Sequence, residues 1–220
     1  MSTIPQIKGY YDSYWIKGKD TFSGDQQGYA ENFRRWMNQQ LGDLPPGTPI
    51  LEVGCGDGSF TKELARYSSA ISAIDISESQ IAENSRRFAG IAFRQHDVAE
   101  PLPFAEGSFG VIWCSEVLEH LFDPAFALKE MYRVLKPGGK LLVTVPYHGF
   151  LKNLLIALFN FDQHYTPSNP HIRFYTKNTL ARITREAGFH AVQTDTCGMN
   201  VPLRDLIVPT NILLRATKAP

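Results

Sequence analysis

The sequence has neither an excess of charge of one sign nor a long apolar run. Its 220 residues include 22 lysines and arginines and 22 aspartates and glutamates, so the formal net charge is zero. A neutral chain does not attract a polyanion as a whole, which argues against a nucleic-acid partner unless a local patch binds it. No apolar run reaches the roughly 18 residues of a membrane span, although contact with a membrane surface stays open.

Cysteine is scarce as well. The three cysteines, Cys55, Cys114 and Cys197, are odd in number and form no C-x-x-C pair. We therefore expect no disulfide framework and a reducing compartment. The first 15 residues lack the apolar core of a secretory signal peptide, so the expected location is the cytoplasm.

From residue 50 onward, short apolar runs alternate with amphipathic segments. Five of the runs have the length of buried strands: 50–53, 70–74, 91–95, 109–114 and 141–145. This alternation is typical of βαβ units around a parallel sheet. Two later runs, 191–196 and 211–216, are expected to pair as a hairpin. We therefore predict one α/β domain over residues 1–220, with a Rossmann-like, doubly wound sheet of seven strands. The sheet is mostly parallel, with an antiparallel terminal hairpin strand.

A glycine-rich turn follows the first predicted strand. Gly54, Gly56 and Gly58 let the backbone approach a ligand closely, and the helix that follows directs its N–H groups toward it. The spacing is GxGxG, whereas the dinucleotide fingerprint GxGxxG would need a glycine in place of Ser59. Asp75 ends the second strand, where its carboxylate can accept hydrogen bonds from both hydroxyls of a ribose. These residues alone fit either a dinucleotide or an adenosyl ligand.

Further motifs distinguish these two ligands. Asp97 ends the third strand, where its carboxylate can accept from an adenine amine. The series EVGCGDG (52–58), AID (73–75), HDV (96–98) and VLKPGG (134–139) resembles that of the class I methyltransferases that use S-adenosylmethionine (SAM). Within this superfamily it is most similar to ubiquinone-pathway O-methyltransferases and the methyltransferase type 11 and 12 group. The resemblance spans about 50–145 and returns at 173–189.

The resemblance implies a SAM site at the carboxyl ends of the strands. The glycine turn would pass under the methionine part of SAM, and Glu52 would orient the turn and the amino group. Asp75 would hold the ribose, while Ile76, Asp97 and Val98 would surround the adenine. The implied cofactor-binding residues are Glu52, Gly54, Cys55, Gly56, Gly58, Asp75, Ile76, Asp97, Val98 and Cys114.

An acidic and histidine-containing motif, ExxEH, follows the fourth strand. If the stretch is helical, Glu116, Glu119 and His120 stand at i, i+3 and i+4 and share one face. Two carboxylates and an imidazole can bind a divalent metal or polarise a hydroxyl. These three are the candidate catalytic residues, with His120 as a base or hydroxyl-orienting group.

The ExxEH motif is similar to two methyltransferase branches. One comprises the ubiquinone-pathway O-methyltransferases, and the other methylates the 2′-hydroxyl at the 3′ end of small RNAs. In the RNA branch a further histidine completes a metal site, and His171 occupies a comparable place here. An EH pair that binds no metal is also widespread in the superfamily. Two alternatives therefore stay open: no metal, or a metal held by Glu116, Glu119, His120 and His171.

Two segments outside the matched core are rich in aromatic or apolar side chains. Residues 1–45 are expected to form an N-terminal helical lid, and residues 147–172 an insertion that covers the acceptor. Within them, 11–15 and 150–161 would form the lid together. The run 150–161 is too short for a membrane span. It is either a core helix or an apolar cover for a hydrophobic or lipid-linked acceptor.

These observations favour an enzyme that transfers a methyl group from SAM to an acceptor. The expected acceptor is an oxygen of a small metabolite or of a lipid- or sugar-linked intermediate. Three alternatives remain at this point: a metal-dependent 2′-O-methyltransferase of RNA ends, an NAD-binding oxidoreductase, and a SAM-binding module without catalysis.

Overall fold

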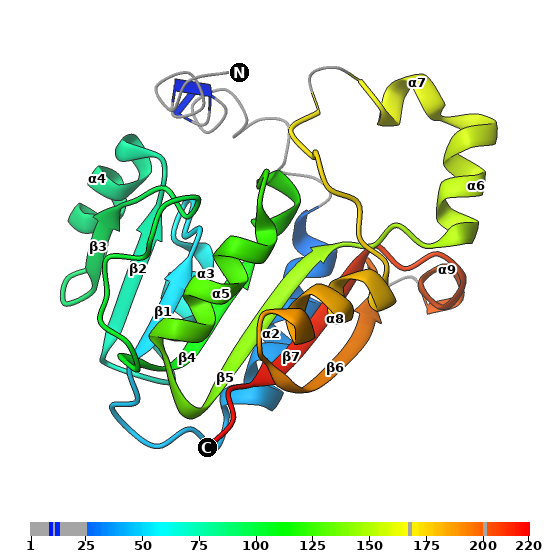
Figure 1. Ribbon diagram of the computed structural model, residues 1–220. Coiled ribbons are helices and arrows are strands. Elements are labelled where there is room, and N and C mark those ends of the chain that lie inside the picture. The colour runs from blue at the N-terminus through cyan, green and yellow to red at the C-terminus, as the bar shows by residue number, and fades with distance from the viewer. Residues whose placement is uncertain (1–8, 11, 14–25, 167–168, 200–201) are drawn as a thin grey trace.

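A seven-stranded sheet forms the centre of the protein (Figure 1). The structure is a computed structural model, and it describes residues 9–10, 12–13, 26–166, 169–199 and 202–220. The strand order is β3-β2-β1-β4-β5-β7-β6. The strands are β1 (Ile50–Val53), β2 (Ile71–Asp75), β3 (Ala92–Gln95), β4 (Phe109–Ser115), β5 (Leu135–Pro146), β6 (His190–Cys197) and β7 (Asn211–Thr217). The first five are parallel, and β7 pairs antiparallel with both β5 and β6. The predicted fold class is confirmed.

Helices cover both faces of this sheet. The helices of the protein include α2 (Gln26–Leu41), α3 (Ser59–Leu64), α4 (Glu78–Arg87), α5 (Pro124–Val134), α6 (Phe150–Phe159), α7 (Phe161–His164), α8 (Lys177–Glu186), α9 (Pro202–Ile207) and the 3-10 turn η1 (Leu118–His120). One apolar cluster joins the sheet to α5 and α8, through side chains such as Met131 and Leu180. A second cluster joins the other face to α2 and α3, through Phe33 and Leu64. This packing is the usual arrangement of a doubly wound sheet.

The strand order reverses between β1 and β4, which are neighbours at the centre of the sheet. In open α/β sheets, ligands bind in the crevice at the carboxyl ends of the strands on either side of such a switch point. The glycine turn follows β1, and the ExxEH motif follows β4. The topology therefore brings the two candidate motifs to the same edge of the sheet.

Two elements differ from the sequence prediction. Strand β5 begins at Leu135 rather than near 141, because the Pro137–Gly139 turn lies within the strand as a bulge against β4. The N–H of Gly138 donates to the carbonyl of Lys218 at 3.1 Å, which holds this bulge in the sheet. Between β6 and β7, the short helix α9 replaces a direct hairpin turn.

The two predicted covering segments differ in their packing. Helix α2, within the predicted lid 1–45, packs on the sheet through buried residues that include Phe33 and Met37. The rest of the predicted lid at 1–8, 11 and 14–25 lies outside the described residues. Helices α6 and α7 project from the body of the protein (Figure 1), and Ile156 is the only buried residue of α6. The core-helix alternative for 150–161 is therefore wrong. Among the described residues, none of the helices has the length and hydropathy needed to cross a bilayer.

Candidate active site

The glycine turn after β1 has a backbone conformation that favours glycine. Gly54, Gly56 and Gly58 all have positive φ, at 75°, 48° and 78°, a region that side chains with a Cβ rarely adopt. A Cβ at Gly54 would also overlap the side chain of Val117. The turn is thus folded tightly at the switch point, and the side chain of Val117 packs directly against its first glycine.

Asp75 ties this turn to the end of β2. Its two carboxylate oxygens accept hydrogen bonds from the backbone N–H groups of Gly56, at 2.8 Å, and Ser77, at 2.9 Å. Each oxygen has a second lone pair, so the carboxylate can also accept from a pair of ribose hydroxyls. Burial raises the pKa of Asp75, while the two N–H donors lower it. Ile76, the next residue, is half-buried.

Glu52 supports the turn from beneath. It is 1% exposed and accepts a hydrogen bond from the hydroxyl of Thr61 in α3. Burial raises the pKa of Glu52 to about 8, although the Thr61 hydrogen bond opposes the shift. Asn84 of α4 donates a hydrogen bond to the carbonyl of Gly56 at 2.8 Å. Cys55, the residue before Gly56, is buried. Helices α3 and α4 therefore both fix the turn that β1 begins.

The end of β3 extends the same edge. The N–H of His96 donates to the carbonyl of Asp75 at 2.9 Å, which places 96–98 beside β2. Asp97 is partly exposed, and its carboxylate accepts from the N–H of Ala99 at 2.9 Å; Val98 is buried. The Nε2 atom of His96 is buried without a hydrogen-bond partner among the described residues. An adenine ring would offer such an atom a polar partner, so the residues present fit an adenosyl ligand.

The stretch after β4 is not the helix that the ExxEH spacing suggested. Only Leu118–His120 are helical, as a single 3-10 turn, and Glu116 has a positive φ of 54°. The Glu116 carboxylate accepts hydrogen bonds from the Thr144 hydroxyl, at 2.8 Å, and from the Asn211 amide, at 3.1 Å. The expectation that Glu116 shares one face with Glu119 and His120 is therefore wrong.

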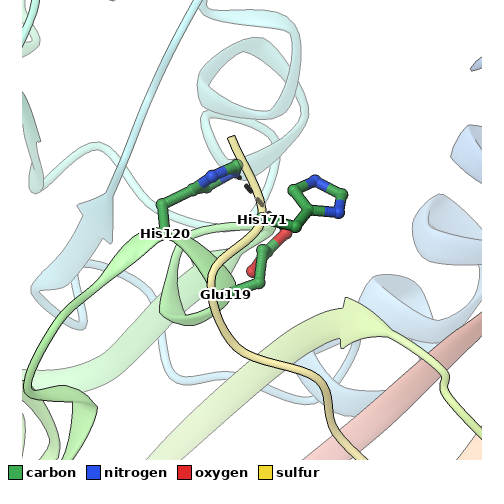
Figure 2. Close-up of side chains that lie close together, drawn as sticks. All are labelled: Glu119, His120 and His171. Carbon is green, nitrogen blue, oxygen red and sulfur yellow. Dashed lines mark ion pairs between the residues drawn. The ribbon is translucent and has the colours of Figure 1, made fainter. Parts of the chain in front are cut away.

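Three of the four candidate metal ligands nevertheless lie together (Figure 2). One potential ligand atom each from Glu119, His120 and His171 lies within 4.8 Å of the other two. The rings of His120 and His171 have centroids 4.9 Å apart. His171 lies close because the N–H groups of Ile172 and Arg173 both donate to the carbonyl of Glu119, at 2.9 and 3.0 Å. The segment before α8 thus crosses directly over η1.

The trio combines a buried carboxylate with two imidazoles whose protonation is disfavoured by burial. Glu119 is 1% exposed, and neither of its carboxylate oxygens has a hydrogen-bond partner among the described residues. The Nε2 atom of His120 is 3.8 Å away, which is too long for a hydrogen bond. Burial raises the pKa of Glu119 well above its usual value, and the nearby Glu116 adds to this. Burial also lowers the pKa of both His120 and His171, the latter to about 4. One carboxylate and two neutral imidazoles form a donor set for a divalent transition metal.

Two further histidines lie in the insertion beside this trio. The rings of His148 and His164 are 5.6 Å apart, and the ring of His148 contacts Phe174 at 4.7 Å. Burial lowers the pKa of His148 to about 4, and the nearby Lys152 also lowers it. Both histidines lie in the segment 147–172 that the sequence predicts as a cover for the acceptor. Thr144, Asn211 and Lys152 were not singled out, because their roles depend on partners far along the chain.

Comparison with known proteins places this site in a family. A family model described as a methyltransferase domain matches residues 51–143. A probable S-adenosylmethionine-dependent methyltransferase from Mycolicibacterium smegmatis is 32% identical, over 81% of this chain and 66% of its own length. A 2-methyl-6-phytyl-1,4-hydroquinone methyltransferase from Synechocystis is 40% identical, over 74% of this chain and 52% of its own. The chain thus spans about half to two thirds of the length of these relatives.

The fold is also similar to solved structures. A chain from the complex between the Haloferax volcanii Trm112 methyltransferase activator and the putative methyltransferase superposes with a TM-score of 0.71. The two are 18% identical, and the match covers 96% of this chain and 98% of the other, so it supports the fold. With the family match, these findings show that the chain belongs to the class I SAM-dependent methyltransferases.

Proposed function

We propose that this protein transfers a methyl group from SAM to an oxygen of a small metabolite or of a lipid- or sugar-linked intermediate. The observation that carries this proposal is the placement of two groups at one edge of the sheet. The Asp75-bound glycine turn follows β1, and the Glu119, His120 and His171 trio follows β4. Because β1 and β4 are adjacent, a ligand on the turn can approach the trio.

The donor needs little chemical help from the protein. SAM supplies a methyl group that is already activated on a sulfonium, so the chain has to align the acceptor and dispose of a proton. In this proposal the turn at 54–58, Glu52 and Cys114 surround the methionine part. Asp75 holds the ribose, and Ile76, Asp97 and Val98 surround the adenine.

We infer further that the trio is a site for a divalent cation. A bound cation would supply Lewis acidity toward the acceptor hydroxyl. Glu119, His120 and His171 would hold it, and the buried, orphaned oxygens of Glu119 support this assignment. The Nδ1 atom of His120 lies 3.2 Å from the carbonyl of Pro170, which fixes the ring orientation of this ligand. Glu116 belongs to a separate hydrogen-bonded group with Thr144 and Asn211.

Two observations support a hydrophobic acceptor. One of the relatives is named for a phytyl-hydroquinone substrate. Helix α6, at the end of β5, also exposes several large apolar side chains, such as Phe150 and Leu158, which are 84% and 63% exposed. An apolar cover of this kind excludes water from a reacting hydroxyl once an acceptor is bound.

A screen with labelled SAM tests this proposal. Purified protein would be incubated with hydroquinones and catechols with and without prenyl tails, with sugar-linked alcohols, and with small RNAs. Mass spectrometry would then locate the methyl group on an oxygen. Methyl transfer confined to RNA ends would overturn the assigned acceptor class. Binding of SAM without transfer to any pool would indicate a binding module, and protection against unfolding by NAD instead of SAM would indicate an oxidoreductase.

A further inference from the structure

A cavity opens at the base of α6, on the far side of β5 from the glycine turn. Tyr147 at the end of β5, Lys152 of α6, Lys177 at the start of α8 and Thr196 of β6 line it. The space measures about 430 Å³, including its open mouth. Tyr147 immediately precedes His148, so this cavity lies next to the cluster of histidines described above.

The cavity has a positive character. Two of its lining side chains are lysines, and no lining residue is acidic among the described residues. The ammonium of Lys152 is partly buried and makes no hydrogen bond or ion pair with any residue that the structure describes. Burial lowers the pKa of Lys152 to about 8. The charge of the nearby Glu116 opposes this lowering of the pKa, and the charge of Arg204 in α9 increases it.

The nearby carboxylate of Glu116 makes its hydrogen bonds to residues other than Lys152. Both oxygens of the Glu116 carboxylate accept hydrogen bonds, one from Thr144 and one from Asn211. A partly buried ammonium without a direct partner is unfavourable, and an anion that reaches it would be stabilised. The cavity therefore favours a ligand that ends in a carboxylate or a phosphate.

An apolar stripe on α6 begins at the same cavity. Leu151 lines the cavity, and Leu155 and Leu158 follow it at i+4 and i+7, on one face of the helix. These three leucines are 40%, 38% and 63% exposed. Ile207 of α9 lines the cavity as well and is 51% exposed. The cationic cavity and the stripe together match a molecule with an acidic end and a hydrocarbon tail.

We propose that the cavity binds the anionic end of an acidic amphiphile, whose hydrocarbon tail lies along Leu151, Leu155 and Leu158. This inference rests on the proposed function, because it assigns that amphiphile as the methyl acceptor. The acceptor would then be a hydroxylated lipid-like molecule with a carboxylate or a phosphate. Its acidic group is held by Lys152 and Lys177, at a distance from the hydroxyl that receives the methyl group.

Calorimetry with simple probes tests the site without any methyl transfer. Decyl phosphate and decanoate, kept below the concentrations at which they form micelles, should bind to the protein. Decanol, which has the same tail without the charge, should bind at least about tenfold more weakly, as expected for a lost charge-assisted hydrogen bond. Lys152→Met should weaken decyl phosphate binding by a similar factor, and Lys152→Arg should restore most of it. Lys129→Met, on the exposed face of α5, is the matched control and should bind like the original protein.

The outcomes separate this inference from the proposed function. Equal binding of decanol and decyl phosphate, or equal binding by the Lys152→Met and Lys129→Met variants, would overturn the anionic site. If Lys152→Met fails to fold, Lys177→Gln provides the same comparison at an exposed position. Binding only to vesicles that contain phosphatidic acid, and not to decyl phosphate, would indicate a membrane surface and overturn the proposal. Charge-dependent probe binding without methyl transfer to any acceptor would retain the site and overturn the proposed function.

Discussion

The Asp75 carboxylate accepts a hydrogen bond from the backbone N–H of Gly56, at 2.8 Å. This contact joins the acidic end of β2 to the middle of the glycine turn after β1. The two features that point to an adenosyl ligand are therefore parts of one structure. A change at Asp75 should affect the shape of the turn as well as the contact with the ribose.

The first prediction concerns SAM affinity. Asp75→Ala removes the proposed acceptor of two ribose hydroxyls, and each charge-assisted bond contributes about 1.5–3 kcal/mol. We expect SAM binding to weaken by roughly 2 to 4 kcal/mol, measured by calorimetry. Asp195→Ala, at an exposed position of β6, is the matched control and should leave the affinity unchanged. If Asp75→Ala binds SAM like the original protein, the assignment of Asp75 is wrong.

The second prediction separates the two glutamates of the ExxEH motif. Glu119→Gln should lose a bound divalent cation, because the carboxylate of Glu119 lies in the trio. Glu116→Gln should retain it, because Glu116 is held by Thr144 and Asn211. Metal analysis of the purified proteins after exposure to Mn²⁺ or Zn²⁺ and gel filtration makes the comparison. Methyl transfer by the original protein should also fall on addition of EDTA.

Two results would contradict this arrangement. Equal metal content in the two variants would show that the trio is not the binding site. Turnover that is insensitive to EDTA, by protein that contains no metal, would favour the alternative in which His120 acts as a base or orients the hydroxyl. A variant of His171 distinguishes the metal site from the metal-free alternative further. His171→Ala should reduce the metal content of the protein if the trio binds the metal.

Much of the fold and of the candidate cofactor site could be predicted because the signals are local. Apolar runs mark the central strands, Gly54 and Gly56 lie in the turn that follows β1, and Asp75 is the last residue of β2. The parallel order then brings their ends together, since the carboxyl ends of parallel strands share one edge. The order of the strands in the sheet is not visible in such patterns, and only the structure gives it.

The rest depends on contacts between distant residues. Glu116 was expected to share a helical face with Glu119, but its carboxylate binds Asn211, which lies 95 positions along the chain. No local pattern reveals such a partner. His171 came only from the family resemblance, and its position depends on backbone hydrogen bonds to Glu119 that periodicity does not show. The cavity at Lys152 is lined by residues of α6, α8, β6 and α9 and by the segment after β5, so it becomes visible only in the folded protein.

The third prediction concerns the pH dependence of stability. The pKa of Glu52 is raised to about 8 in the folded protein, whereas an unfolded glutamate titrates near 4.3. Between these values the folded state retains a proton that the unfolded state releases, so the contribution of Glu52 to stability falls as pH rises. We expect this loss to reach the order of a few kcal/mol between pH 5 and pH 8.

Glu52→Gln isolates this contribution, because glutamine can still accept from Thr61 but does not ionise. The variant should become more stable relative to the original protein as pH rises from 5 to 8, measured by urea unfolding without SAM. Glu186→Gln, on the exposed face of α8, is the control. A constant difference between the Glu52→Gln and original proteins across this range would show that Glu52 is ionised in the fold.

The last prediction concerns the covering segments. Helix α6 buries only Ile156, so its amide groups should exchange hydrogen rapidly in the empty protein. Asp12 accepts a hydrogen bond from the hydroxyl of Ser79 at 3.0 Å, which places Asp12 beside the start of α4 and close to Asp75. SAM alone should therefore protect the glycine turn, Asp75 and Asp97, while α6 remains exposed.

Protection of α6 should require SAM and an acceptor together. A lid closes when its apolar side chains gain a partner, and the exposed leucines of α6 have the acceptor as that partner in our proposal. The segment 11–15, part of which lies outside the described residues, should gain protection at the same time. Hydrogen exchange followed by mass spectrometry distinguishes the three states. If both segments are already fully protected in the empty protein, they belong to the static core, and closure cannot be what brings acceptor and donor together.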